Sequence, residues 1–186
     1  MSGTVKLFIG PMFCGKTESM INILERQVIA NRHLSKKKEC VIVKYANDTR
    51  YDSKSTNGIV TNSGVERNIV KVVKAKNLKD LDLSEYDLIG IDELQFYPDG
   101  PEEIQRLVNL GKEIVGSGLD ADYLNRPFLR MPEIIANAED VIKLKAVCMQ
   151  CGGSASFTKR IGNSDQIEDI GGAEKYLAVC RSCHHK

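Results

Sequence analysis

The 186 residues of the chain are enough for one domain with a small appendage and for a hydrophobic core of its own. Apolar residues make up 42% and charged residues 27%, a composition that excludes a wholly disordered chain. The 26 basic and 25 acidic residues leave a net charge of +1, so no global basic field indicates a nucleic-acid or membrane partner.

Targeting signals are not evident in the sequence. No stretch approaches the roughly 18 apolar residues of a membrane span, and residues 1–9 are too short and too polar for a signal peptide. We therefore expect a cytoplasmic protein. Its six cysteines are then expected to remain reduced and to serve metal binding or packing rather than disulfides.

The apolar pattern predicts strands that alternate with helices. Strands are expected at 4–9, 40–43, 68–73, 88–91 and 113–119, with helices from Thr17 to about Arg32 and from Pro101 onwards. Residues 51–64 are rich in Ser, Asn, Thr and Gly and favour a mobile surface loop. This alternation is typical of an α/β fold with a mostly parallel sheet and helices on both faces.

The composition changes after about Ala146, where four of the six cysteines are concentrated. We expect a nucleotide-binding α/β domain over residues 1–145 and a small second domain over 146–186.

Residues 10–17 match the phosphate-loop pattern G-x-x-x-x-G-K-[ST] at every fixed position. Its glycines let the backbone curl so that N–H groups face phosphate oxygens, and the following helix directs its positive end at the same anion. A glycine-bearing turn that matches by chance is the alternative, but a strand precedes the motif and a helix follows it. The candidate phosphate-binding residues are Gly10, Pro11, Met12, Phe13, Cys14, Gly15, Lys16 and Thr17, with the Thr17 hydroxyl as a Mg²⁺ ligand.

Asp92 and Glu93 follow directly after the apolar strand at 88–91. A phosphate-loop fold places its second Mg²⁺-side carboxylate at such a strand end, which favours Asp92 for the metal and leaves Glu93 to take a proton. The alternative is a solvated turn. Asp48, Thr49 and Arg50 follow the second strand on the same sheet edge, where Arg50 could stabilise the transferring phosphoryl group or be a surface residue.

Two C-x-x-C pairs lie in the C-terminal segment, and 28 residues separate Cys151 from Cys180 (180 − 151 − 1). Paired knuckles of this kind indicate a tetrahedral Cys₄ site, and Zn²⁺ with four protein ligands has a structural role. Two disulfides are the alternative, and His184 or His185 could compete as ligands. The candidate zinc ligands are Cys148, Cys151, Cys180 and Cys183.

The sequence resembles type II thymidine kinases from about Val5 to Cys183, with the shared motifs in the same order. The segments that carry the resemblance are Gly10-Pro11-Met12-Phe13-x-Gly15-Lys16, Lys44-Tyr45-Ala46-x-Asp48-Thr49-Arg50-Tyr51, Ile91-Asp92-Glu93-x-Gln95-Phe96, Leu119-Asp120, Arg126-Pro127-Phe128, Lys145-Ala146-Val147-Cys148-Met149-x-Cys151, Thr158-Lys159-Arg160 and Ile170-Gly171-Gly172-Ala173-x-Lys175-Tyr176.

The resemblance implies transfer of the γ-phosphate of Mg²⁺-bound ATP to the 5′-hydroxyl of thymidine, a salvage step that supplies DNA synthesis. It implies Glu93 as the catalytic base and Gln95 in the ATP-side loop. It further implies a zinc-bearing lasso, a homotetramer and feedback inhibition by dTTP. The nucleoside-binding residues that it implies are Met12, Phe96, Leu119, Tyr123, Ile167, Glu168, Asp169, Ile170, Gly171 and Tyr176.

The chain departs from the family pattern at Cys14, Leu94, Tyr123 and Asp169. Two other functions are compatible with the motifs alone: a phosphate-loop ATPase whose zinc domain binds nucleic acid, and a non-enzymatic zinc adaptor. A nucleic-acid-binding zinc domain should have a basic or aromatic surface, whereas acidic residues offset the basic ones here. Glu93 beside an intact phosphate loop disfavours the adaptor.

Overall fold

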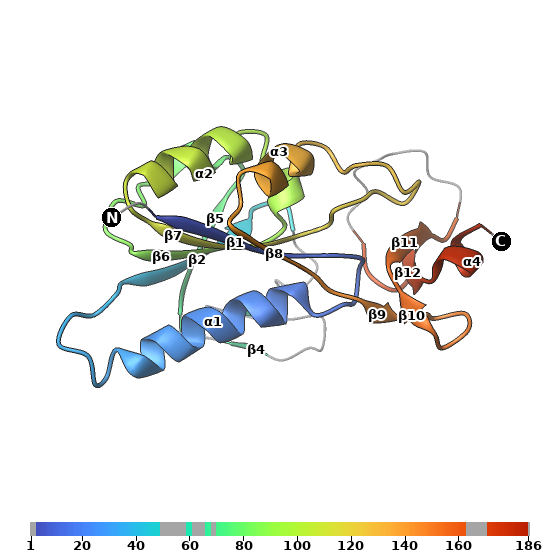
Figure 1. The fold of residues 1–186 in the computed structure, drawn as a ribbon, viewed down its shortest axis with the longest axis horizontal. Helices are drawn as coiled ribbons and strands as arrows, with labels where there is room; N and C mark the ends of the chain where they lie inside the picture. Colours follow the sequence, from blue (N-terminus) through green and yellow to red (C-terminus); the bar gives the residue numbers. More distant parts are fainter. Residues whose placement is uncertain (1–2, 49–58, 61–65, 68–69, 163–170, 186) are drawn as a thin grey trace.

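A six-stranded sheet forms the centre of the molecule in the computed structural model, which describes residues 3–48, 59–60, 66–67, 70–162 and 171–185. The strand order is β5-β2-β6-β7-β1-β8, and each neighbouring pair runs parallel. The predicted α/β class with a mostly parallel sheet is confirmed (Figure 1). These strands are β1 (Thr4–Ile9), β2 (Cys40–Tyr45), β5 (Lys71–Ala75), β6 (Leu88–Ile91), β7 (Glu113–Gly118) and β8 (Asp140–Lys143).

Helices cover both faces of this sheet (Figure 1). Helix α1 (Lys16–Ala30) lies on one face, while α2 (Gly100–Asn109) and α3 (Met131–Ala136) lie on the other. Because side chains alternate along a strand, neighbouring residues of β1 enter different cores. Phe8 packs in the cluster that contains Met20 of α1, and Leu7 packs in the cluster that contains Leu107 of α2.

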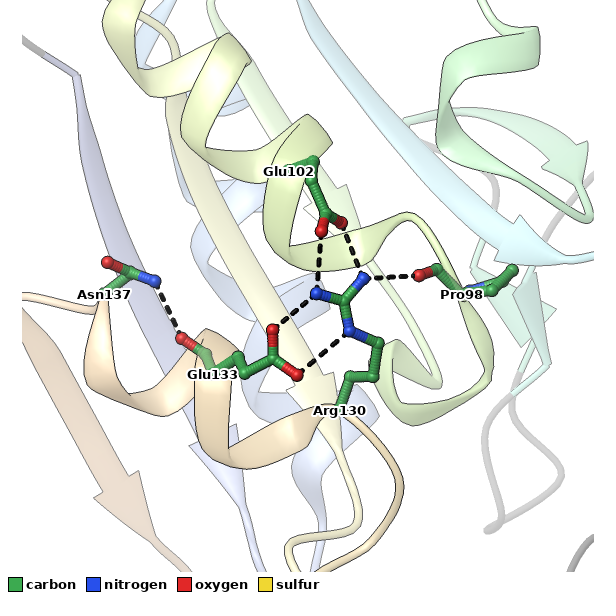
Figure 2. A network of polar contacts seen from close by, with 5 residues as sticks. All are labelled: Pro98, Glu102, Arg130, Glu133 and Asn137. Carbon is green, nitrogen blue, oxygen red and sulfur yellow. Dashed lines mark hydrogen bonds and ion pairs between the residues drawn. The ribbon is translucent and has the colours of Figure 1, made fainter.

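Arg130, just before α3, ties α3 to α2 (Figure 2). Its guanidinium donates two hydrogen bonds of 2.7 Å to the Glu102 carboxylate and also contacts Glu133. A further bond of 2.9 Å reaches the Pro98 carbonyl. One side chain therefore links three segments at the surface of the α2–α3 face.

The C-terminal segment forms small sheets beside the main one. Strand β9 (Ala146–Val147) pairs with β10 (Ser154–Ala155), and β11 (Phe157–Arg160) pairs with β12 (Tyr176–Val179), all antiparallel. The short helix α4 (Arg181–His184) follows β12. We call the described part of this segment, residues 146–162 and 171–185, the cysteine module.

Several elements differ from the sequence prediction. The strand expected at 68–73 begins at Lys71 within the described residues and continues to Ala75. Most of the loop expected at 51–64 lies outside those residues, but β3 (Ile59–Val60) within it pairs with β4 (Glu66–Arg67). The 3₁₀ helices η2 (Leu78–Asp80) and η3 (Leu94–Phe96), together with α3 and β8, were not predicted.

No helix in the described part of the chain combines the length and the apolar character needed to cross a bilayer.

Candidate active site

The phosphate loop connects β1 to α1 at the carboxyl edge of the sheet. Gly10 has a φ of 136°, and a Cβ placed there would lie 2.5 Å from the Leu144 carbonyl oxygen, so the loop requires glycine at this position. The ammonium of Lys16 donates to the Pro11 carbonyl at 2.6 Å. The predicted loop residues 10–17 thus form one turn with the lysine folded across it.

Asp92 follows β6 and lies next to this loop. The Thr17 hydroxyl donates to Asp92 Oδ1 at 2.9 Å, and the Ser117 hydroxyl donates to the same oxygen. Hydroxyl and carboxylate oxygens are ligands that Mg²⁺ prefers, so the pair Thr17–Asp92 suits that ion. Ser117 was not predicted as a site residue, although a serine near the end of a predicted apolar strand was a usable signal.

Glu93 is the first residue of a sharp turn and has a left-handed backbone, with φ of 53°. Its carboxylate accepts a hydrogen bond of 2.5 Å from Gln95 Nε2, and Gln95 Oε1 accepts the Leu119 N–H at 3.0 Å. Gln95, predicted for the ATP side, is buried and joins the candidate base to the loop after β7. Leu94, where the family pattern has glycine, is fully buried against Gly116.

An aromatic cluster lies on the other side of this turn. The Phe96 ring stacks on Tyr45 with a centroid distance of 5.3 Å and meets Phe128 edge-on at 5.8 Å. The neighbouring Tyr97 is almost fully buried, and this burial, reinforced by Asp92, raises its hydroxyl pKa well above the usual range. Phe96, a predicted nucleoside residue, is therefore packed against two other aromatic rings.

Two predicted nucleoside residues, Tyr123 and Tyr176, meet at Arg160. The Arg160 guanidinium lies 3.9 Å from the Tyr123 ring centroid and 5.3 Å from that of Tyr176. It also donates to the Tyr176 hydroxyl at 2.7 Å. The loop after β7 is itself ordered by buried Asp122, which accepts the Leu124 and Arg126 N–H groups.

The remaining predicted ligands fall into two groups. Asp48 is buried in the loop that follows β2, and Gly171 is buried before β12. Outside the described residues lie Thr49, Arg50, Ile167, Glu168, Asp169 and Ile170, so their roles stay predictions.

The phosphate loop also contacts the cysteine module directly. The Met12 N–H donates to Thr158 Oγ1 at 3.0 Å in a buried hydrogen bond. Phe13, with a φ of 64°, packs against the small core that contains Cys148, Ala178 and Val179. These contacts place the predicted Met12 and Phe13 between the two parts of the chain.

The four predicted zinc ligands come together in the cysteine module. Their sulfur atoms all lie within 4.8 Å of one another, and the Cys151 and Cys180 sulfurs are 3.7 Å apart. A tetrahedral zinc site with Zn–S bonds of about 2.3 Å has sulfur–sulfur edges of about 3.8 Å, so the donor set fits this ion. All six cysteines are unpaired in this structure, and the four sulfurs are arranged as a single donor set rather than as two disulfides.

The four thiols of the cluster differ in pKa. Hydrogen bonds with Cys183 lower the pKa of Cys180, whereas the hydrogen bond with Cys180 raises the pKa of Cys183. Although desolvation acts to raise the Cys148 pKa, backbone donors, including the Cys180 N–H at 3.2 Å, lower it to about 6. His184 Nε2 lies 3.0 Å from the Tyr123 carbonyl oxygen, so this ring contacts the loop after β7 rather than the four sulfurs.

Comparisons with known proteins agree with this geometry. The family model described as thymidine kinase matches residues 3–184. The chain is 40% identical to the thymidine kinase of Myxoma virus (strain Lausanne) over 98% of this chain and 96% of that protein. It is 39% identical to the Vaccinia virus (strain Ankara) thymidine kinase over 98% and 97%, respectively. With thymidine kinase 1 of Dictyostelium discoideum it shares 38% identity over 100% of this chain and 79% of that protein. The chain therefore belongs to the thymidine kinase family.

Proposed function

We propose that the protein transfers the γ-phosphoryl group of ATP to the 5′-hydroxyl of thymidine, and of deoxyuridine, to give the nucleoside monophosphate and ADP. One structural observation carries the chemical part of this proposal. Asp92 accepts a hydrogen bond from Thr17 of the phosphate loop, and the next residue, Glu93, is connected through Gln95 to Leu119. Two consecutive carboxylates thus link the phosphate side to the nucleoside side.

Glu93 acts as the general base in this proposal. It accepts the proton of the 5′-hydroxyl as that oxygen forms its bond to the γ-phosphorus and the bond to the β-phosphate oxygen breaks. Gln95 holds the Glu93 carboxylate from a buried position. A base held by a rigid neighbour keeps its orientation without loss of side-chain entropy at each turnover.

The phosphates are held by the loop of residues 10–17, with Lys16 at the β- and γ-phosphates and Asp48, Thr49 and Arg50 at the same sheet edge. Thr17 and Asp92 would hold the Mg²⁺ that accompanies ATP. When bound, this ion neutralises charge that develops on the phosphate oxygens. Lys16 has to leave the Pro11 carbonyl to reach a phosphate, so nucleotide binding includes a change of partner for its ammonium.

The nucleoside lies between the loop after β7 and the cysteine module in this proposal. Met12, Phe96, Leu119, Tyr123 and Tyr176 line the pocket, and backbone groups of 167–171 contact the edge of the base. A pocket wall of this kind favours thymine over uracil by the binding free energy of one methyl group, about 1–3 kcal/mol. The module, as a second domain after residue 145, would be held by a structural Zn²⁺ on its four cysteines.

Salvage of thymidine for DNA synthesis, a homotetrameric assembly and inhibition by dTTP complete the proposal. They rest on family membership. dTTP unites the two recognition elements of the site, a thymine base and a triphosphate, in one molecule.

The decisive test is ADP production from Mg²⁺-ATP with thymidine, deoxyuridine, deoxycytidine, single-stranded DNA or no acceptor. We expect stimulation by thymidine with formation of thymidine monophosphate. Stimulation by DNA alone would favour the ATPase alternative, and turnover indifferent to every acceptor would reject nucleoside phosphorylation.

A further inference from the structure

Ser117 occupies the central position of the phosphate edge of the sheet. Strand β7 lies between β6, which leads to Asp92, and β1, which leads to the phosphate loop. The register pairs Phe8 with Ser117 and Ile91 with Gly116, so Ser117 lies level with the residue that follows Ile91. That residue is Asp92, and the two side chains meet there.

The hydroxyl of Ser117 is buried, with 1% of the residue exposed. It contacts Asp92 Oδ1 and, at 3.6 Å, the Met20 sulfur. A hydroxyl has one proton, and a carboxylate is a much stronger acceptor than a thioether. The proton of Ser117 therefore goes to Asp92, and this contact satisfies a polar group that burial would otherwise penalise.

Asp92 Oδ1 accepts hydrogen bonds from two hydroxyl groups that belong to different elements. Thr17 belongs to the phosphate loop and the first turn of α1, whereas Ser117 belongs to a strand with hydrogen-bonded neighbours on both sides. In the proposed function Thr17 also serves the metal. Ser117 is buried, so its hydroxyl is not exposed to competition from solvent and holds the carboxylate from within the sheet.

We propose that Ser117 is a positioning residue that fixes the Asp92 carboxylate for the divalent cation of the nucleotide complex. The inference rests on the proposed function, because it assumes that Asp92 serves that cation. Hydrogen bonds to a metal-side carboxylate preserve its orientation, and their loss generally weakens metal affinity about 10–100-fold. Ser117→Ala should therefore weaken cation binding without removing a ligand.

The test measures Mn²⁺ binding, without turnover, in the presence of a non-hydrolysable ATP analogue, with free Mn²⁺ followed by electron paramagnetic resonance. We expect Ser117→Ala to weaken Mn²⁺ binding about tenfold. Ser117→Cys should fall between it and the wild type, because a thiol is a weak donor of similar size. The Mg²⁺ concentration for half-maximal turnover should rise in the same order, with kcat at saturating Mg²⁺ nearly preserved.

Two further variants test whether a loss of Mn²⁺ affinity comes from core packing and whether Asp92 serves the metal. Met20→Leu removes the other partner of the hydroxyl with little change in volume and should leave Mn²⁺ binding unchanged. Asp92→Asn tests the proposed metal role and should weaken binding more than Ser117→Ala.

Wild-type Mn²⁺ affinity in both Ser117 variants, with a clear loss in Asp92→Asn, would overturn the role of Ser117 alone. An equal loss in Met20→Leu and Ser117→Ala would also overturn it, because core packing would explain the effect. Wild-type affinity in Asp92→Asn would instead reject the metal assignment of the proposed function. If Ser117→Ala fails to fold, Ser117→Cys decides between these outcomes.

Discussion

The Met12 N–H of the phosphate loop donates to the Thr158 hydroxyl of β11 across 146 residues of sequence. Both partners are buried, and Phe13 packs against the cysteine module beside this bond. The loop that is expected to hold ATP is therefore supported from the part of the chain that carries the four cysteines.

Replacement of Thr158 by Val should leave the Met12 N–H buried without its acceptor. An unsatisfied buried donor costs about 1–3 kcal/mol, so the free energy of unfolding should fall by that amount and Mg²⁺-ATP binding should weaken. Urea unfolding and nucleotide titration would measure the two effects. Thr158→Ser retains the hydroxyl and is the matched control; equal behaviour of the two variants would contradict the prediction.

Replacement of Glu93 by Gln preserves the shape of the side chain and removes its basicity. ATP binding should be retained, while phosphoryl transfer to thymidine should fall at least about 100-fold, the usual scale for a general base. Single-turnover kinetics with saturating ATP would isolate this step. Near wild-type turnover would exclude Glu93 as the base.

Gly118 allows the close approach of Gln95 to the loop after β7. A Cβ at this position would lie 2.8 Å from Gln95 Oε1 and 3.3 Å from Leu94 Cβ. Gly118→Ala should therefore displace Gln95, loosen Glu93 and lower kcat more than it weakens ATP binding. The kinetics of Gln95→Ala provide the comparison, and wild-type kcat in Gly118→Ala would show that the Gln95 contact is dispensable.

Removal of metal from the cysteine site should disorder the module before the main sheet unfolds. Metal binding and folding are coupled in such sites, while β1 and β7 pack in cores that are separate from the core of the cysteine module. Hydrogen exchange after chelation should show early loss of protection in β11 and β12 and then in the phosphate loop. Thymidine affinity that survives complete metal removal would contradict the supporting role of the module.

The Arg130 network should contribute stability that depends on pH. Hydrogen bonds from Arg130 lower the pKa of Glu102 and of Glu133 below the ordinary value of 4.5. A lowered carboxyl pKa stabilises the fold above pH 4.5, and this contribution is lost as the pH falls through the folded-state pKa. The melting temperature of Arg130→Ala should therefore lie below that of the wild type at pH 7, with the difference shrinking below pH 4.5. A difference that stays constant down to pH 3 would contradict the ionic origin.

Local patterns explain what the sequence could predict. The phosphate loop, the buried strand before Asp92 and the cysteine spacing are short-range signals with direct structural meaning. The predicted start of a helix near Pro101 is likewise confirmed, since α2 begins at Gly100. The prediction was possible because proline suits the first helical turn.

Other features could not be predicted from the sequence because they depend on contacts between residues far apart in the chain. Strand β8 has a short, half-exposed pattern and exists because it pairs with β1. The left-handed turn at Glu93 depends on buried Leu94 and on Gly116, in a strand that follows about 20 residues later. The contact of Arg160 with Tyr123 joins segments whose proximity no local pattern encodes.

The contact between the phosphate loop and the cysteine module limits how this chain can be recombined with its relatives. A chimera that exchanged only the residues after 145 would place Met12 and Phe13 of this chain against the C-terminal segment of a relative, in place of their own contacts with Thr158 and the module core. The unit of exchange is therefore discontinuous, because residues 12 and 13 belong with the C-terminal segment although they lie near the start of the chain.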